Sequence, residues 1–152
     1  MQGVYKVGDD IATVTTATPL LFLKAAADRC IEILSARVTC VDEPTSEQFQ
    51  CKLTIPSGTE AGGDTVTPHP MGADSAPADS TALSDATAIT GLTGGDIEAA
   101  FAGHAANKLG GWEYVPLPEE RPMIKGAQEL LLETTTTITS CTLHAEIVFR
   151  EL

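Results

Sequence analysis

The stretch EQFQCKLTIP, residues 47–56, alternates apolar and polar side chains more clearly than any other part of the chain. A period of two is typical of a half-buried β-strand, and Pro56, which has no N–H to donate, is expected to end it. One predicted face carries Phe49, Cys51, Leu53 and Ile55, and the other carries Gln48, Gln50, Lys52 and Thr54.

Further short runs have the composition of strands, and they set the fold class. In 142–152 the alternation predicts that Leu143, Ala145, Ile147 and Phe149 point inward. In 30–41 Glu32 breaks the pattern and indicates a strand end or an edge. The predicted inward set of that run is Cys30, Leu34, Ala36, Val38 and Cys40, and the other expected strands are 11–16, 20–24 and 129–139.

Two turns suggest how these strands connect. VDEPTSE (41–47) is rich in turn residues and predicts a hairpin of 30–41 with 47–56. A reversal at Ser140 and Cys141 predicts a second hairpin of 129–139 with 142–152. The fold class expected from these runs is all-β and antiparallel, with at most one short helix.

Residues 57–96 differ in composition from the strands, because they are dense in Gly, Pro, Ser, Thr and Asp. We interpret them as a long ordered loop inserted at about 57–96 into a single domain of residues 1–152, partly buried between subunits. Residues 82–89 are a candidate strand within it. For 96–109 the spacing of apolar residues fits a helix capped by Asp96, but Gly103 and the glycines that follow favour a strand and a loop equally well.

The totals exclude several classes of function. Nine Lys and Arg against 21 Asp and Glu give a formal net charge of −12, which disfavours direct binding of nucleic acid. No apolar run is long enough to span a membrane, and the first ten residues do not resemble a signal peptide, so no membrane partner is expected. The cysteines Cys30, Cys40, Cys51 and Cys141 are interpreted as reduced thiols, with a Cys40–Cys51 bridge as the alternative.

No motif for catalysis or for metal binding is present. His69, His104 and His144 have no partner at ligand spacing, and the paired acidic residues are adjacent in sequence, so their side chains point apart on an extended chain. Phosphate-binding, dinucleotide-binding and serine-nucleophile patterns are missing. The sequence therefore predicts no catalytic residue, no cofactor and no metal, and a protein that is not an enzyme.

The stretch GGWEYVPLPEERPMI, residues 110–124, contains the only tryptophan and three of the nine prolines. Its prolines favour an extended, polyproline-like path, which a proline-reading domain would also recognise. We instead interpret it as a rigid connection laid over the edge of the domain, with the tryptophan as anchor and charged residues at the surface. The structural or interface candidates are Trp112, Tyr114, Pro116, Pro118, Glu119 and Arg121.

The order of these features resembles that of small virion proteins of tailed bacteriophages. It comprises an N-terminal strand, the strand pairs above, the loop with TVTPHPMG, then GWEYVPLPEERP, KGAQELLLE and a strand ending in an acidic residue. FAGHAANKLGG departs from that pattern.

The resemblance implies a jelly-roll-like β-sandwich that acts as a capsid decoration, or cement, protein on the outer surface of the phage head, after synthesis in the host cytoplasm. It also implies the major capsid protein as partner and self-association, with a homotrimer as first choice. The alternative is a tail or fibre module that recognises a cell-surface glycan or another virion protein.

Overall fold

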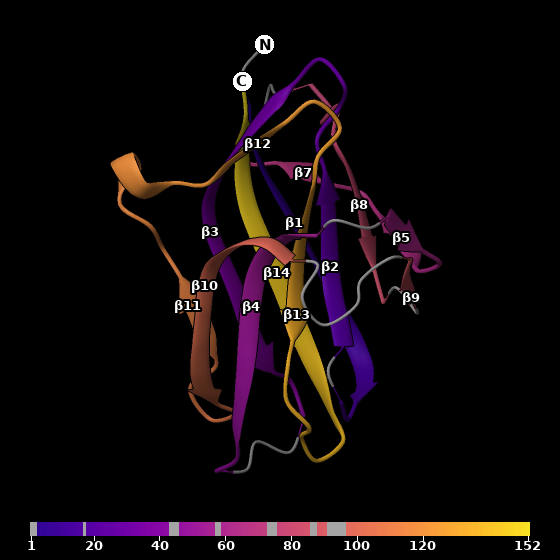
Figure 1. Ribbon diagram of the computed structural model, residues 1–152, viewed down its shortest axis with the longest axis vertical. Coiled ribbons are helices and arrows are strands. Elements are labelled where there is room, and N and C mark those ends of the chain that lie inside the picture. The colour runs from indigo at the N-terminus through magenta and orange to yellow at the C-terminus, as the bar shows by residue number, and fades with distance from the viewer. Residues whose placement is uncertain are drawn as a thin grey trace.

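The computed structural model describes residues 3–16, 18–42, 46–56, 59–72, 76–85, 88–90 and 97–152. It shows two antiparallel six-stranded sheets packed face to face, which confirms the predicted all-β sandwich (Figure 1). The only helix of the described residues is a single 3-10 turn, η1 (Pro118–Glu120), so none is long enough to cross a membrane.

The first sheet has β14 and β1 at its centre. Its order is β11 (Trp112–Tyr114), β3 (Cys30–Cys40), β14 (Cys141–Glu151), β1 (Gly3–Val14) and β7 (His69–Pro70), and β12 (Met123–Lys125) also pairs with β3. β1 starts well before the predicted 11–16 and ends before Thr15.

The second sheet covers the inner face of the first. Its order is β10 (Ile97–Asn107), β4 (Gln48–Pro56), β13 (Glu129–Thr134), β2 (Thr18–Lys24), β8 (Thr81–Ser84) and β6 (Asp64–Val66). A separate pair is formed by β5 (Thr59–Ala61) and β9 (Ala88–Thr90).

Both predicted hairpins are wrong. β3 lies in the first sheet and β4 in the second, and β14 and β13 are divided in the same way. The connections therefore carry the chain from one sheet to the other. Strands that face each other across a core alternate as regularly as strands that pair side by side, so the pattern cannot distinguish the two arrangements.

The eight principal strands pair in a nested order. β1 pairs with β14, β2 with β13, β3 with β11, and β4 with β10, so the first half of the chain is matched in reverse by the second half. β14 also pairs with β3, and β13 with β4, which joins these strand pairs into the two sheets. As a result the fold depends on pairing between strands that are far apart in sequence.

One hydrophobic core lies between the sheets and contains the predicted inward residues of two strands. In β14 burial alternates along the whole strand, and Leu143, Ala145, Ile147 and Phe149 are all buried. The Phe149 ring stacks on Tyr5 of the neighbouring β1 with 5.6 Å between ring centroids. In β4 Phe49, Cys51 and Leu53 are buried, as predicted, and Ile55 packs against the same core.

The predicted faces of β3 are wrong in its first half. Ile31 and Ile33 are buried, whereas Cys30 and Leu34 are only partly buried. A register shift opposite Val148 and Phe149 inserts one extra residue, so the alternation changes phase before Ala36 and Val38. Such a β-bulge explains why Glu32, the third residue of β3, lies on the outer face although the predicted pattern placed that position inward.

Residues 97–107 form the strand β10, so the helix alternative for 96–109 is wrong. The strand pairs along β4 with two register shifts. Alanine-rich spacing fits a helix locally, but pairing with an existing sheet overrides a weak local preference. The side chain of His104 lies outside the described part of the chain, as does the residue Asp96.

Part of the predicted loop 57–96 is held by its own domain. Glu151, which is buried, accepts hydrogen bonds from the backbone N–H groups of Asp79 (3.2 Å) and Ser80 (2.7 Å). The Tyr5 hydroxyl donates to the Ala76 carbonyl at 3.1 Å. The predicted strand 82–89 is divided between β8 and β9, and burial between subunits stays a prediction.

All four cysteines are free, and only Cys51 and Cys141 are buried. Cys40 and Cys51 lie on strands of different sheets, so the alternative bridge between neighbouring strands has no basis in the fold.

Candidate interaction site at the sandwich edge

The residues 112–125, here called the edge segment, follow the outer side of β3. β11 pairs with Ala36–Val38 and β12 with Cys30–Glu32, so both ends of the segment belong to the first sheet. Between them the chain leaves the sheet, and Figure 1 shows η1 as the part that projects farthest from the sandwich. The segment is thus paired with β3 at both ends, and the part between them, residues 115–122, lies outside the sheet.

Trp112 anchors the first end. Its side chain is 4% exposed, it belongs to the core cluster, and it lies opposite Val38. Its ring stacks on Tyr114 with 6.4 Å between ring centroids. Gly111 precedes it with φ +70° and with the Val38 carbonyl oxygen 2.7 Å from where a Cβ would lie, so only glycine fits this approach.

Backbone and charge contacts anchor the second end. The Ile33 N–H donates to the Pro122 carbonyl at 3.0 Å, and Ile124 is fully buried. The two carboxylate oxygens of Glu32 accept from Arg121 (3.3 Å) and Arg150 (3.1 Å). Glu32 is therefore the point at which the segment is joined to the outer face of the sheet.

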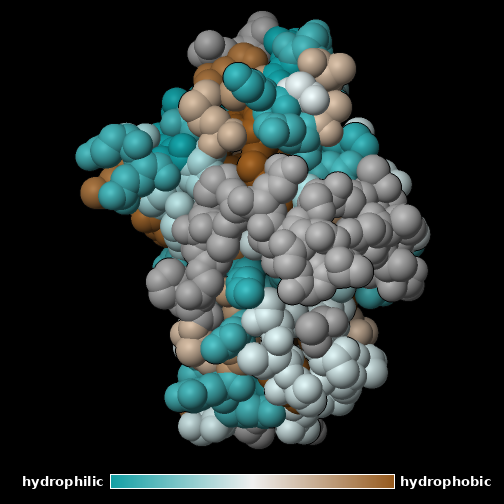
Figure 2. Space-filling view, in the orientation of Figure 1, coloured by the Kyte–Doolittle hydropathy of each residue, from teal (hydrophilic) through white to brown (hydrophobic). Residues whose placement is uncertain are grey.

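Exposed aliphatic side chains lie on the part between the two strands and at the first residue of β12. Val115 is 65% exposed, Leu117 58% and Met123 53%. Exposed large hydrophobic residues that gather on one segment mark an interaction surface more often than scattered ones do. In Figure 2 the projection is hydrophilic, with hydrophobic atoms at its outer end and beneath it.

Acidic residues accompany these side chains. Glu113, Glu119 and Glu120 are exposed, and no ion pair of theirs is found among the described residues. Burial, and to a lesser degree the charge of Glu120, raise the pKa of Tyr114. The segment thus offers aliphatic groups beside unpaired carboxylates.

The predicted site residues have different surroundings. Trp112 and Pro116 are buried, Tyr114 and Arg121 are partly buried, and Pro118 and Glu119 are exposed. The predicted polyproline-like path is interrupted: Leu117 and Arg121 are extended, but the 3-10 turn lies between them, closed by a bond from the Glu120 N–H to the Leu117 carbonyl. A continuous polyproline ligand is therefore not formed.

Sequence reasoning missed Val115, Leu117 and Met123. They stand between buried residues of the same segment, and their position after Trp112 and Tyr114 is the only signal that would have indicated them. Trp112, Pro116, Pro122 and Ile124 are buried and hold the segment, while Val115, Leu117 and Met123 are exposed.

Two polar side-chain pairs lie on the sandwich away from the edge segment. Ser84 donates to Asp9 between the two sheets, and His144 lies 2.6 Å from Asp10 on the outer face of the first sheet. No group of three or more His, Cys, Asp or Glu in the described ranges is placed to hold a metal ion. His69 is exposed in β7 and is not part of such a group.

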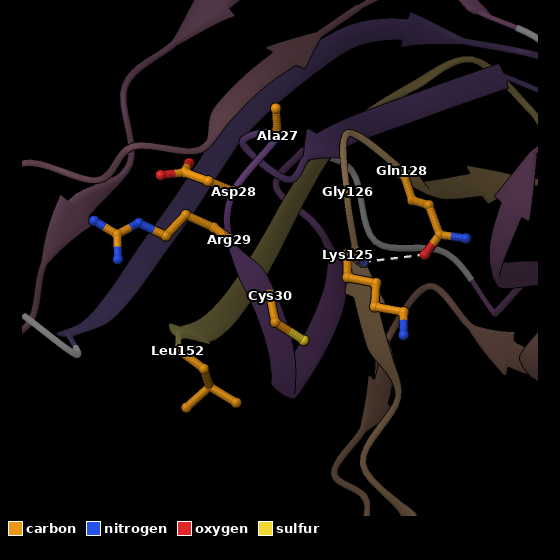
Figure 3. A pocket seen from close by; sticks show the side chains of 8 residues that line it. All are labelled: Ala27, Asp28, Arg29, Cys30, Lys125, Gly126, Gln128 and Leu152. Atoms are coloured by element: carbon orange, nitrogen blue, oxygen red, sulfur yellow. Dashed lines mark hydrogen bonds between the residues drawn. The ribbon is translucent and has the colours of Figure 1, made fainter.

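A surface hollow of about 610 Å³ lies where β3 and β14 meet β12. It is lined by residues that include Arg29, Cys30, Lys125, Gln128 and Leu152 (Figure 3). Arg29 is paired with Asp79 at 2.6 Å, and its side chain and that of Lys125 point away from each other. The charged groups of Arg29 and Lys125 therefore do not converge on a common ligand position in the hollow.

The fold and this edge define an all-β sandwich protein with a projecting apolar and acidic segment. Comparison with protein-family models, with curated proteins and with solved structures found no match for the chain.

Proposed function

We propose that this chain is a non-enzymatic structural protein of a phage virion, a capsid decoration protein that binds the major capsid lattice from outside and stabilises it. The edge segment is the observation that carries the proposal. A module that reinforces a shell needs exposed apolar groups on a fixed frame. Val115 and Leu117 are exposed between the two anchored ends, and Met123 is exposed at the start of the second end.

The strand order supports a jelly-roll assignment. A jelly roll contains eight strands in two sheets, and it is common among viral capsid domains. The nested pairing of β1 to β4 with β14, β13, β11 and β10 agrees with a long two-stranded ribbon rolled into a sandwich. In this assignment β5 to β9 are an insertion between the fourth and fifth principal strands.

The chemistry of the edge segment suggests the complementary surface. Aliphatic side chains beside Glu113, Glu119 and Glu120 fit an apolar hollow with basic groups at its rim. We propose that the major capsid protein supplies this surface, and that three copies of the chain gather around a local three-fold axis of the shell. Trimer formation is an analogy with decoration proteins and rests on no contact in the structure.

The glycan-binding alternative is less well supported. Sugar platforms need exposed aromatic rings, but Tyr5, Phe22, Phe49, Trp112 and Phe149 are buried, and Tyr114 is partly buried. No aromatic side chain in the described part of the chain is exposed. A tail location is therefore an outcome of the test below.

Cosedimentation with expanded capsids tests the proposal. The wild-type chain is expected to bind at a saturating ratio set by the lattice, and Leu117→Asp is expected to weaken binding at least about tenfold, because an unpaired carboxylate would enter an apolar contact. Met71→Asp is the matched control, since Met71 is equally exposed (61%) but lies beyond β7. Equal binding of both variants contradicts the role of the edge segment, and labelled protein found only on tails contradicts the decoration function.

A further inference from the structure

Two of the four cysteines lie side by side at one end of the first sheet. Cys40 is the last residue of β3 and Cys141 the first of β14, and these strands are antiparallel neighbours with Cys40 opposite Leu143. Side chains two residues apart on a strand share a face, so Cys141 lies on the same face as Leu143 and Cys40. The two cysteines are therefore diagonal neighbours across one strand pair, with Cα atoms roughly 7–8 Å apart, so a bridge between them requires a small shift of the two strand ends.

The contacts of the two thiols agree with this register. The Cys40 and Cys141 thiols are near enough to interact electrostatically, and Cys40 Sγ donates to the Asp42 carbonyl at 2.8 Å. Both pack against the same core cluster. Cys30 is at the opposite end of β3, roughly 33 Å away for ten residues of extended strand, and Cys51 is in the other sheet.

The surroundings give the two thiols different roles. Cys40 is partly exposed, so a reagent in solution can reach it, whereas Cys141 is buried. Burial raises the pKa of Cys141 to about 11, and the nearby Lys108 ammonium acts in the opposite direction. Lys108 is itself held by Glu47 at 2.7 Å and by the Thr139 carbonyl at 2.8 Å. Cys51 has no such cation, and burial raises its pKa to about 12.

We propose that Cys40 and Cys141 are a dithiol site that forms an intramolecular disulfide when the protein meets a small-molecule disulfide such as oxidised glutathione. The Cys40 thiolate attacks the S–S bond of the oxidant, forming a mixed disulfide and releasing one thiol. Cys141 Sγ then attacks Cys40 Sγ, and the second thiol leaves. The two cysteines lose two electrons and two protons in total, and the oxidant is reduced to two thiols.

The bridge has a consequence for stability. It joins β3 to β14 across a loop of about 100 residues, and a crosslink that closes a long loop restricts the unfolded chain strongly. The pair stays reduced in a cytoplasm and becomes oxidised outside it. The inference does not depend on the proposed function, because it concerns only contacts within one chain.

Oxidation of the purified chain with oxidised glutathione tests the site. The wild-type protein is expected to lose two hydrogen atoms by intact mass, to give one crosslinked peptide pair containing Cys40 and Cys141, and to melt roughly 5–10 °C higher. Cys30→Ser is the matched control and is expected to do the same. Cys40→Ser is expected to form no internal bridge.

Three results would overturn the proposal: a bridge that involves Cys30 or Cys51, a stable glutathione adduct on Cys40 without release of the second thiol, or full recovery of all free thiols after oxidation. Peptide mapping of the wild-type protein distinguishes them without reliance on the folding of any variant.

Discussion

Phe149 and Glu32 lie on the same strand pair, and they show what a local pattern can and cannot indicate. Phe149 follows the alternation of β14 without interruption, and it is fully buried as predicted. Glu32 breaks the alternation of β3 because a bulge shifts which residues of that strand face the core. The sequence does not reveal such a bulge when apolar residues are present at both odd and even positions. Ile31 and Leu34 are such residues, and only pairing with β14 decides between them.

Phe149→Ala tests the core directly. The substitution is expected to lower the free energy of unfolding by roughly 3–5 kcal/mol, because it removes a fully buried aromatic ring that stacks on Tyr5. Arg150→Ala is the neighbouring control and is expected to cost below about 1 kcal/mol, since Arg150 is partly exposed on the outer face and its ion pair is with Glu32. Chemical denaturation measures both, and similar small losses would show that the burial of this strand has been misassigned.

Asp42 connects stability to pH. Hydrogen bonds from the Thr142 N–H and hydroxyl, each at 2.7 Å, lower the pKa of Asp42 below its ordinary 3.8. A carboxylate whose pKa is lower when folded stabilises the protein above its unfolded pKa and loses this contribution as pH falls through its folded pKa. Asp42→Asn is therefore expected to destabilise the protein at pH 7 and to matter progressively less below about pH 3.8.

Denaturant midpoints of wild type and Asp42→Asn across this range provide the measurement. Glu47, whose pKa is lowered by Lys108 and Thr139, contributes to the loss of stability in acid in both proteins, so only the difference between them reports on Asp42. Asp64→Asn, at an exposed position of β6, is the control substitution and is expected to change the denaturant midpoint little. A gap between wild type and Asp42→Asn that grows toward low pH would contradict the prediction.

The strands themselves were largely predictable, whereas their partners were not. Runs 20–24, 30–41, 47–56 and 142–152 agree with β2, β3, β4 and β14 within a residue or two. The assignment to two hairpins failed because each connecting turn leads from one sheet to the other. The sequence of a turn does not specify whether it joins two paired strands or two strands of different sheets. β10 was undecided for a related reason, since its strand conformation depends on β4.

Glu32 joins the edge segment to the first sheet through its contacts with Arg121 and Arg150. Glu32→Gln keeps the size of the side chain but removes the charge that holds Arg121 and Arg150. We expect a loss of about 1–2 kcal/mol in unfolding free energy and faster hydrogen exchange of the Ile33 N–H, which bonds to Pro122.

Glu113→Gln is the control for this substitution. Glu113 is exposed in β11 at the other end of the same segment and is expected to change neither quantity measurably. If Glu32→Gln leaves the exchange of Ile33 as slow as Glu113→Gln does, the backbone alone holds the segment and the arginine contacts are incidental.

For the whole molecule, composition and alternation were enough to predict an all-β antiparallel fold, whereas the sandwich was predicted from the resemblance. The two layers follow because a half-buried strand must cover its apolar face. Composition and alternation were not enough to predict the projecting site. Its exposed side chains are ordinary aliphatic residues, and they form a surface only because β11 and β12 fix both ends of the segment on β3.

Net charge makes a final prediction about how this molecule binds its proposed shell. If a chain with a net charge of −12 bound its shell through opposite charges, its affinity would fall steeply as salt rises, because screening shortens the range of such attraction. Attachment through Val115, Leu117 and Met123 would change little with salt. We expect the apolar contact to dominate, so the dissociation constant should change by less than about tenfold between about 0.05 and 0.5 M salt, while Glu119→Lys combined with Glu120→Lys should alter mainly the rate of association. Capsid binding measured at several salt concentrations decides the matter: a loss of many tenfold steps across this range would show that the carboxylates, and not the aliphatic residues, carry the binding energy.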